Sequence, residues 1–498
     1  MKVEITNDQM TRLVDEVVAQ VKQQLGNGAS APDLTRSAPP RATFATVPAS
    51  APVAASAHSD GVFADVDQAI AAAQRSFDEL QGCTLSDRQA MVSAMRQAAV
   101  REAERLARFA VEETGLGRVS AKVQKILLAA RKTPGTEDLT PVAYTGDDGL
   151  SLVEPAPFGV AGVITPSTNP PSTVVNNAIC MVAAGNTAVF NPHPSAKGVS
   201  NEVVRVLNRA ILEAGGPANV LCSVASPTLE SSQALMQHPA IRLLLVTGGG
   251  IVVKLAMTSG KKAVAAGPGN PPVIVDDTAS LSHAARHIVD GASFDNNVLC
   301  IGEKEVFVFR NVADRFKEEM RRAGAFEVTG ADRDRLVERC LDLSQPDHPV
   351  AARDLVGKDA HLLLAEVGLT APPDTRLIFC EVDDLYHPLI QAEQLMPFLP
   401  ILRVDGLDEA LACAKQAEHG FRHTATMHSE NVVSMSRVAR EIETTIFVKN
   451  APSYAGLGFG GEGFTTLSIA GPTGEGLTSP RTFTRQRRCV LAGSFRIV

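Results

Sequence analysis

The sequence lacks any apolar run that approaches the roughly 20 consecutive residues needed to span a bilayer. Basic residues are not in excess either: 47 Lys and Arg stand against 55 Asp and Glu, which gives a net charge of -8. A nucleic-acid binder usually carries a basic face, and an anionic membrane surface attracts basic segments. We therefore expect neither nucleic acid nor a membrane among the partners of this protein.

Cysteine is also scarce. The 498 residues include eight cysteines at irregular spacing and no Cys-x-x-Cys pair. This usage is typical of reduced thiols inside a cell, so we expect a cytoplasmic protein, and we expect no metal site. A chain of this length exceeds one compact core, so two or three domains are expected.

The first 60 residues differ in pattern from the rest. Within "ITNDQMTRLVDEVVAQVKQQLG" the apolar residues from Met10 to Leu25 recur at short helical intervals, which predicts an amphipathic helix in residues 1–25. Residues 26–60 are rich in Ala, Pro and Ser and predict a flexible linker, because they bury too little apolar surface to offset the entropy of ordering. The residues alone leave two interpretations open. The helix packs on its own domain or its copy in an oligomer, or it docks in the groove of a partner.

From residue 61 onward, apolar segments alternate with amphipathic ones. "GVAGVITP", "TAVFNP" and "IRLLLVTGGG" predict strands, while "NPPSTVVNNAICMVAAGN" and a segment opened by Ser86 predict helices. This alternation is typical of an α/β fold with a parallel sheet, whose ligands bind at the carboxyl ends of the strands. A second α/β unit begins near "GPGNPPVIVDD", and "RTFTRQRRCVLAGSFRIV" predicts a β-rich tail suited to edge pairing with another subunit.

The segment "LLLVTGGGIVVKLAM" predicts a strand, a glycine turn and a helix. Such a turn offers backbone N–H groups to a phosphate or a nicotinamide. The Gly-x-Gly-x-x-Gly fingerprint is absent, however, and three glycines also suit an ordinary tight turn. The pattern alone leaves both interpretations open.

Several blocks together carry a resemblance to a known family: "VITPSTNPPSTVVNNAICMVAAGNTAVF", "LLLVTGGGIVVKLAMTSGKKAVAAGPGNPPVIVD", "FDNNVLCIGEK", "AEQLMPFLP", "EHGFRHTATMHS" and "TSPRTFTRQRRCVL". From about residue 60 to its end the sequence resembles the aldehyde dehydrogenase superfamily. Within it, the likeness is to the CoA-acylating branch, typified by the propionaldehyde and acetaldehyde dehydrogenases of bacterial microcompartments.

This resemblance implies a domain organisation. It implies a Rossmann-type NAD-binding domain in residues 61–140 and 159–269, and an α/β catalytic domain in residues 270–480. A small β oligomerisation arm is expected in residues 141–158 and 481–498 of a homodimer or homotetramer. The resemblance also favours docking for residues 1–25, as an encapsulation helix that binds a shell or core protein and places the enzyme in the lumen of a microcompartment.

The resemblance assigns the nucleophile to Cys300, which lies between a polar Asp-Asn-Asn run and an apolar segment in "SFDNNVLCIGEKEVFVF". Chemistry agrees with that assignment. An aldehyde carbon must become tetrahedral before it releases hydride readily, and a thiolate attacks strongly and leaves again from the thioester. The remaining seven cysteines are expected to be structural: Cys83, Cys180, Cys222, Cys340, Cys380, Cys413 and Cys489.

The oxyanion formed on attack requires hydrogen-bond donors held in place. One candidate is the backbone N–H of Cys300. The second comes from the loop "TPSTNPP", where the resemblance leaves Asn169 and Thr168 as alternatives. A structural interpretation is also open, in which these polar side chains cap the following helix.

A missing carboxylate separates this sequence from the hydrolytic members of the family. Ala266, 34 residues before Cys300, stands where those members carry their general-base glutamate. Without that base, a thioester on Cys300 persists until the thiol of coenzyme A accepts the acyl group. A hydrolytic enzyme that yields a carboxylic acid remains the alternative, as does a scaffold protein that has lost its activity.

His423 matches the histidine of the acylating branch, and an imidazole titrates in the range suited to accepting a thiol proton. The neighbouring His419 and His428 are expected to be surface or packing residues.

The resemblance also implies the cofactor contacts. Glu393 matches the glutamate that binds the nicotinamide ribose, and Thr247, Gly248 and Gly249 are expected beside the nicotinamide, with Pro166 as a further contact. Asn191 stands where many members carry a lysine for the adenosine ribose, which leaves the choice between NAD and NADP open. The resemblance implies NAD, coenzyme A as co-substrate, and a short-chain aldehyde of undefined length.

Overall fold

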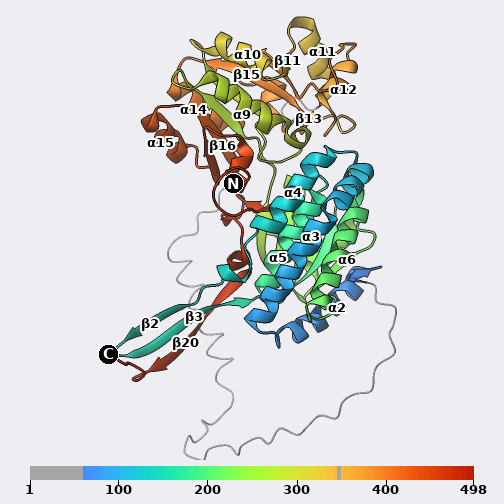
Figure 1. Ribbon diagram of the computed structural model, residues 1–498, viewed down its shortest axis with the longest axis vertical. Coiled ribbons are helices and arrows are strands. Elements are labelled where there is room, and N and C mark those ends of the chain that lie inside the picture. Colours follow the sequence, from blue (N-terminus) through green and yellow to red (C-terminus); the bar gives the residue numbers. More distant parts are fainter. Residues whose placement is uncertain (1–59, 345–348) are drawn as a thin grey trace, which may run out of the picture. The chain divides into compact units, whose positions relative to one another are not determined.

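The computed structural model describes residues 60–344 and 349–498. The helix expected in residues 1–25 and almost all of the linker expected in residues 26–60 lie outside the described residues. The described residues belong to one compact unit, and its strands and helices alternate as the sequence predicts (Figure 1). Among the helices of the described part, none is both long enough and apolar enough to cross a membrane.

The first sheet has six parallel strands in the order β1-β6-β5-β4-β7-β8. Its strands are β1 (Val62–Phe63), β4 (Val160–Thr165), β5 (Thr187–Pro192), β6 (Leu221–Val224), β7 (Ile241–Thr247) and β8 (Lys262–Ala266). The helices of this part are α2 (Val66–Leu80), α3 (Leu85–Thr114), α4 (Val119–Lys132), α5 (Pro170–Ala183), α6 (Lys197–Glu213), α7 (Leu229–Gln237) and α8 (Gly250–Met257), with 3-10 turns η1 (Thr136–Asp138) and η2 (Pro194–Ala196).

Strand β4 lies at the point where the strand order reverses. From β4 the chain continues to β5 and β6 on one side, and it later returns to β7 and β8 on the other. Ile164 of β4 is level with Val246 of β7, so both strands end at the same height. In open parallel sheets, ligands bind in the crevice beyond this reversal point.

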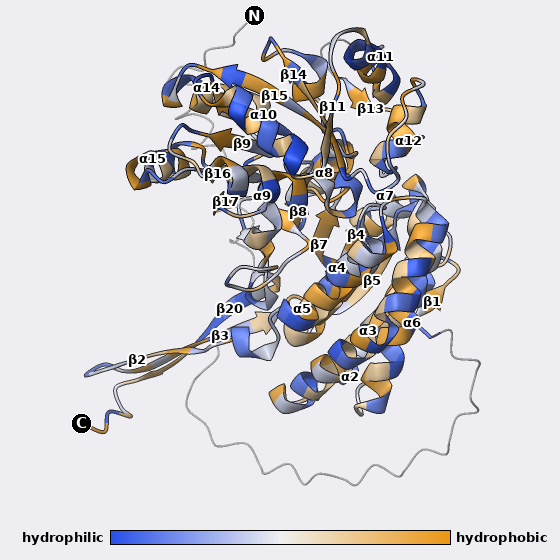
Figure 2. Ribbon diagram, turned by 45° about the horizontal axis from the view of Figure 1, so that its top comes forward, coloured by the Kyte–Doolittle hydropathy of each residue, from blue (hydrophilic) through white to orange (hydrophobic). Residues whose placement is uncertain are grey.

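Helices cover both faces of this sheet because alternate strand residues point to opposite sides. Val163 packs with α3, α5 and α6, whereas Ile164 packs with α2, α7 and α8. Orange and blue bands alternate along α3, as expected for an amphipathic helix (Figure 2).

Helix α3 begins two residues earlier than predicted. Thr84, not Ser86, is the cap: Thr84 Oγ1 accepts from the Asp87 N–H at 3.1 Å, and Asp87 returns the contact by accepting from the Thr84 N–H at 2.8 Å. This reciprocal pair satisfies two backbone donors, and the Asp87 carboxylate also favours the positive end of the helix.

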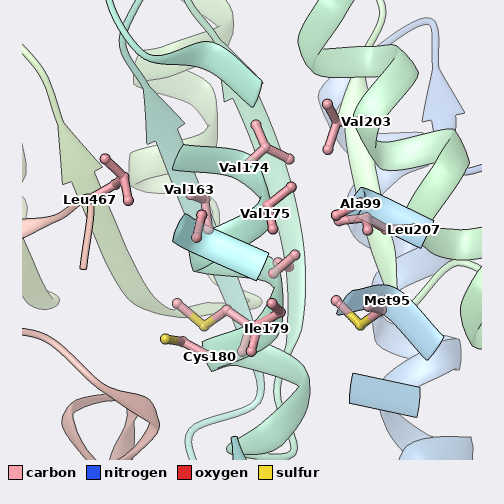
Figure 3. Close-up of a cluster of buried hydrophobic side chains, with 14 of the residues drawn as sticks. Met95, Ala99, Val163, Val174, Val175, Ile179, Cys180, Val203, Leu207 and Leu467 are labelled. Carbon is pink, nitrogen blue, oxygen red and sulfur yellow. The ribbon is translucent and has the colours of Figure 1, made fainter. Parts of the chain in front are cut away.

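Helix α5 is buried on all sides, and it begins directly after Asn169. Figure 3 shows Val174, Val175, Ile179 and Cys180 of α5 in the shared core, with side chains of α3, α6 and β4 around them. Full burial of one such aliphatic side chain stabilises a fold by about 1.5–3 kcal/mol. The core therefore fixes the start of α5 and the loop before it.

The second sheet has seven parallel strands in the order β11-β14-β15-β10-β9-β16-β17. Its strands are β9 (Pro272–Val275), β10 (Glu305–Phe309), β11 (Ala325–Glu327), β14 (Leu377–Val382), β15 (Phe398–Val404), β16 (Thr424–His428) and β17 (Ile446–Lys449). The helices are α9 (Leu281–Ser293), α10 (Ala313–Arg322), α11 (Gly330–Cys340), α12 (Ala360–Ala365), α13 (Pro388–Gln391), α14 (Leu407–Ala417) and α15 (Val432–Glu441), with η3 (Phe294–Asn297), η4 (Ser453–Leu457) and η5 (Pro480–Phe483). Two short antiparallel pairs join β12 (Leu341–Asp342) to β13 (Val350–Ala351) and β18 (Ile469–Ala470) to β19 (Gly476–Leu477).

A three-stranded antiparallel sheet completes the unit, with β2 (Val142–Gly146), β3 (Gly149–Pro157) and β20 (Thr484–Ala492) in the order β2-β3-β20 (Figure 1). The tail is β-structured, as the sequence predicts. One edge of β20 is therefore paired within the chain, because β20 joins β3 over nine positions.

Candidate active site

A pocket of about 460 Å³ lies beyond the carboxyl ends of β4, β5, β7 and β8. Its volume is within the range of small-molecule sites. The structure brings all ten predicted site residues to its lining: Pro166, Thr168, Asn169, Asn191, Thr247, Gly248, Gly249, Cys300, Glu393 and His423. These residues are spread over more than half of the sequence, so it is the fold that assembles them.

Cys300 lies in the turn between η3 and β10 and is half-buried in the pocket wall. Burial raises the pKa of its thiol to about 12, and the charge of Glu393 acts in the same direction, while Lys304 and Lys125 oppose it. None of the other seven cysteines lines this pocket. Five of them are buried; Cys83 is half-buried in the turn before α3, and Cys489 is exposed on β20.

Three residues before the Cys300 turn have left-handed backbone: Asp295, Asn296 and Asn297 have φ values of 50°, 53° and 62°. Asp and Asn tolerate this conformation better than other side chains with a Cβ. The polar run next to Cys300 therefore has a conformational reason as well as a chemical one.

Asn169 precedes the first residue of α5, but its side chain makes no capping hydrogen bond. The capping interpretation is therefore wrong for Asn169. Its Oδ1 instead accepts from Lys125 Nζ at 2.5 Å, and its Nδ2 donates to Thr168 Oγ1 at 3.1 Å. The two alternative oxyanion residues are thus in contact with each other.

Two buried lysines of α4 contact this loop, and nothing in the sequence pattern predicted a role for them. Lys122 Nζ is 3.1 Å from Asp295 Oδ2 and 3.2 Å from the Thr168 carbonyl oxygen. Lys125 pairs with the same Asp295 oxygen. Burial lowers the pKa of Lys125 to about 8, against the opposing charge of Asp295. The available signal was the presence of two lysines on the buried face of an otherwise amphipathic segment, "AKVQKILLAARK".

His423 is buried in the pocket wall beside the chain segment of Cys300. A Cβ built on Gly269 would lie 2.9 Å from the Cys300 carbonyl oxygen and 3.0 Å from His423 Cγ, so only glycine fits between them. His423 Nδ1 contacts Thr424 Oγ1 at 2.9 Å. Burial and the charge of Lys304 lower the pKa of His423 to about 4, so the imidazole is neutral at pH 7, although the same shift makes it a weaker base than a free imidazole.

The two flanking histidines do not line the pocket. His419 is exposed, and its Nε2 lies 3.1 Å from the Gln391 carbonyl oxygen. His428 is buried at the end of β16, where burial and His287 lower its pKa to about 3. Both agree with the expected surface and packing assignments.

One end of the pocket suits a nicotinamide dinucleotide. A Cβ built on Gly248, Gly249 or Gly250 meets no atom within 4 Å, so the glycine turn offers an open backbone surface before α8. Glu393 adds a carboxyl group whose pKa is raised to about 7 by burial, although Lys304 and the Gly269 N–H oppose that shift. Ribose hydroxyls donate to such a carboxylate.

Asn191 and Ala266 supply no charge to the pocket. The Asn191 carboxamide is used at both ends, since Nδ2 donates to Ser232 Oγ at 2.8 Å and Oδ1 accepts from Ser231 Oγ at 2.7 Å. Ala266 is 2% exposed at the end of β8. Both residues line the pocket that Cys300 also lines. The described residues also hold no group of three or more His, Cys, Asp or Glu arranged to bind a metal.

This chain is similar to known proteins over most of its length. The sequence profile of the aldehyde dehydrogenase family matches residues 41–338. Acetaldehyde dehydrogenase (acetylating) EutE of Salmonella typhimurium is 49% identical over 447 residues, which cover 89% of this chain and 95% of that protein.

Two solved structures are similar over most of this chain. A propionaldehyde dehydrogenase from the Clostridium phytofermentans fucose utilisation bacterial microcompartment has a TM-score of 0.86 and 47% identity, with 88% of this chain and 100% of that chain covered. A propionaldehyde dehydrogenase of Rhodopseudomonas palustris, crystallised with bound CoA and an acylated cysteine, has a TM-score of 0.85 and 45% identity. There the match covers 87% of this chain and 99% of that chain.

Proposed function

Because this chain belongs to the aldehyde dehydrogenase family, we propose that it is a CoA-acylating aldehyde dehydrogenase. It oxidises a short-chain aldehyde, acetaldehyde or propionaldehyde, with NAD and coenzyme A to acyl-CoA and NADH. One observation carries the proposal. Cys300 lines the same pocket as His423, Glu393 and the glycine turn, and Ala266 stands in that pocket without a carboxylate.

In this proposal Cys300 is the nucleophile. Its sulfur forms a bond to the aldehyde carbon, and its proton passes to the neutral imidazole of His423. The resulting oxyanion is held by the Cys300 backbone N–H and by a side chain of the loop, Asn169 or Thr168. Bound NAD supplies the acceptor for the hydride that leaves the carbon as the carbonyl re-forms, which yields a thioester on Cys300.

Release of the acyl group requires a second thiol. With alanine at position 266, the glutamate that activates water in hydrolytic members is missing, so the thioester survives until coenzyme A attacks it. His423 first releases the proton from Cys300 to solvent and then accepts the proton of the CoA thiol. The new sulfur–carbon bond forms, the bond to Cys300 breaks, and His423 returns its proton to the Cys300 thiolate. One thioester replaces another, so this exchange proceeds at nearly equal energy.

The domain assignment follows from the same proposal. The first parallel sheet binds NAD, within residues 61–140 and 159–269. The second sheet carries the nucleophile, within residues 270–480. The antiparallel sheet serves a homodimer or homotetramer, through residues 141–158 and 481–498.

Residues 1–25 are proposed to dock on a microcompartment shell or core protein and so to place the enzyme in the lumen. The helical apolar pattern of residues 1–25 supports this, as does the linker expected in residues 26–60. A similar protein also comes from a microcompartment.

The deciding assay follows NADH formation from a panel of aldehydes, with and without CoA. We expect formation to depend on CoA and the product to be acyl-CoA. Fast turnover without CoA, with a carboxylic acid as product, would instead establish the hydrolytic alternative.

A further inference from the structure

Lys125 of α4 has no task in the reaction proposed above, although it is 3% exposed and reaches the loop of the pocket. Buried ammonium groups are costly unless they are paired and hydrogen-bonded. Lys125 meets that condition with two partners, Asp295 and Asn169. Asn169 is one of the two side chains that could hold the oxyanion.

The contact fixes which way the Asn169 carboxamide is turned. An ammonium group has donors only, so the atom of Asn169 that faces Lys125 Nζ is the carbonyl oxygen. The amide nitrogen then lies on the other side, where one of its hydrogens goes to Thr168 Oγ1 at 3.1 Å. Its second hydrogen has no protein acceptor among the described residues, and Asn169 lines the pocket.

We propose that Lys125 is a positioning residue that orients the Asn169 carboxamide, so that its free N–H meets the aldehyde oxygen. This rests on the proposed function. It also resolves the two alternatives in the loop, because Asn169 is then the donor to the oxyanion and Thr168 is the acceptor that holds its other hydrogen. Without Lys125 the carboxamide is free to turn its oxygen to the oxyanion, which repels it.

The net charge of Lys122, Lys125 and Asp295 allows a test in which each variant is expected to fold. Lys122 and Lys125 share Asp295, so the three buried side chains carry one excess positive charge. Removal of either lysine leaves a neutral pair rather than an unpaired buried charge, and both variants are therefore expected to fold. Lys122 contacts Asp295 and the Thr168 carbonyl oxygen, but not the Asn169 side chain. Lys122→Met is thus the matched control for Lys125→Met.

The measurement is the rate of the first NADH turnover, with circular dichroism and thermal unfolding as checks on folding. Lys125→Met should slow this step about 10- to 100-fold, approaching the loss of one oxyanion donor. Its KM for NAD should stay at the wild-type value. Lys122→Met should keep the rate within about threefold. Lys125→Gln retains N–H donors without a charge, but its carbonyl oxygen can face Asn169 as well, so it should recover only part of the rate lost in Lys125→Met.

A double-mutant cycle decides whether Lys125 acts through Asn169. If it does, Lys125→Met should cost nothing further in an Asn169→Ala background. Additive losses, equal losses in Lys122→Met and Lys125→Met, or no recovery in Lys125→Gln would each overturn the inference. If Lys125→Met does not fold, Lys125→Gln takes its place in the cycle: its loss should disappear in the Asn169→Ala background, and a loss that persists there overturns the inference.

Wild-type turnover separates this inference from the proposed function. Absence of CoA-dependent NADH formation in the wild type refutes the function itself. CoA-dependent turnover with an additive cycle refutes only the positioning role of Lys125.

Discussion

Replacement of Ala266 with glutamate should let water compete with CoA for the acyl group on Cys300. Ala266 lines the pocket that contains Cys300, and it is 2% exposed, so a carboxylate there enters a nearly dry wall of the site. General-base catalysis contributes about 10²–10⁴-fold when the base is well placed. A gain near the lower end, about 10²-fold in CoA-free NADH formation, is expected from a base that has not been positioned by neighbouring residues.

The gain should depend on pH in a definite direction. Burial raises the pKa of Glu393, a carboxyl in the same pocket, to about 7. A glutamate at position 266 meets similar desolvation, so we expect it to be about half ionised near pH 7 and fully active only above pH 8. CoA-free turnover should therefore rise from pH 6 to pH 8 and then level off.

The raised pKa of the introduced carboxyl also lowers the stability of the folded variant. A carboxyl whose folded-state pKa lies above its unfolded value of 4.5 binds more protons when folded, so the free energy of unfolding falls as pH rises from about 4.5 to about 7. The loss amounts to about 3 kcal/mol for a shift of that size. The melting temperature of Ala266→Glu should thus fall further below that of wild type at pH 8 than at pH 5.

Ala266→Gln is the matched control, because it fills nearly the same volume without a base. The quantity to follow is the ratio of CoA-free to CoA-dependent rate, since either side chain can crowd the nicotinamide and lower both rates. A ratio that stays flat in a folded Ala266→Glu variant that still acylates Cys300 would show that something other than the lost glutamate keeps water out. Rapid CoA-free turnover in the wild type would refute the acylating assignment.

Three further predictions concern other parts of the chain. Cys300→Ala should abolish NADH formation and leave the unfolding curve close to that of wild type, because Cys300 lies half-buried in a turn; residual turnover would point to another cysteine. The charge of Glu393 raises the pKa of Cys300, so Glu393→Gln should speed alkylation of Cys300 by iodoacetamide at pH 8. At pH 6 the wild-type carboxyl is already protonated, and the variant should react at the wild-type rate. It should also raise the KM for NAD, and an alkylation rate unchanged at pH 8 would contradict the coupling. Deletion of residues 1–25 should leave solution kinetics unchanged and abolish co-purification with microcompartment shells, whereas a large loss of activity or stability would favour packing of that segment on its own protein.

The sequence predicted the sheet that positions the site because its signals are local. Strand β4 is apolar from Val160 to Ile164, and the glycine turn before α8 follows directly from three consecutive glycines. Thr84 was missed as the cap of α3 because Ser86 offers the same kind of side chain two residues later. The reciprocal bonds between Thr84 and Asp87 decide the start.

The pairing of the tail is a different case, because it depends on contacts that are distant in the sequence. The composition of residues 481–498 predicts a strand, but not its neighbour. The register of β20 against β3 joins residues more than 300 positions apart, from Thr484 with Pro157 to Ala492 with Gly149. No periodicity within either segment predicts that β20 pairs with β3.

Lys125 shows most clearly where sequence patterns fail at a functional site. Lysines are almost never fully buried unless they are paired, so a pattern-based interpretation assigns them to the solvent face of a helix. Here the partner, Asp295, lies 170 residues away in the run before Cys300, and the pairing becomes visible only in three dimensions. Family resemblance identified the residues that meet the substrate in the proposed reaction, whereas the contacts that hold one of them, Asn169, in a single orientation came from the structure. Such supporting contacts are therefore the part of the site that most depends on coordinates, and the Lys125 variants test one of them directly.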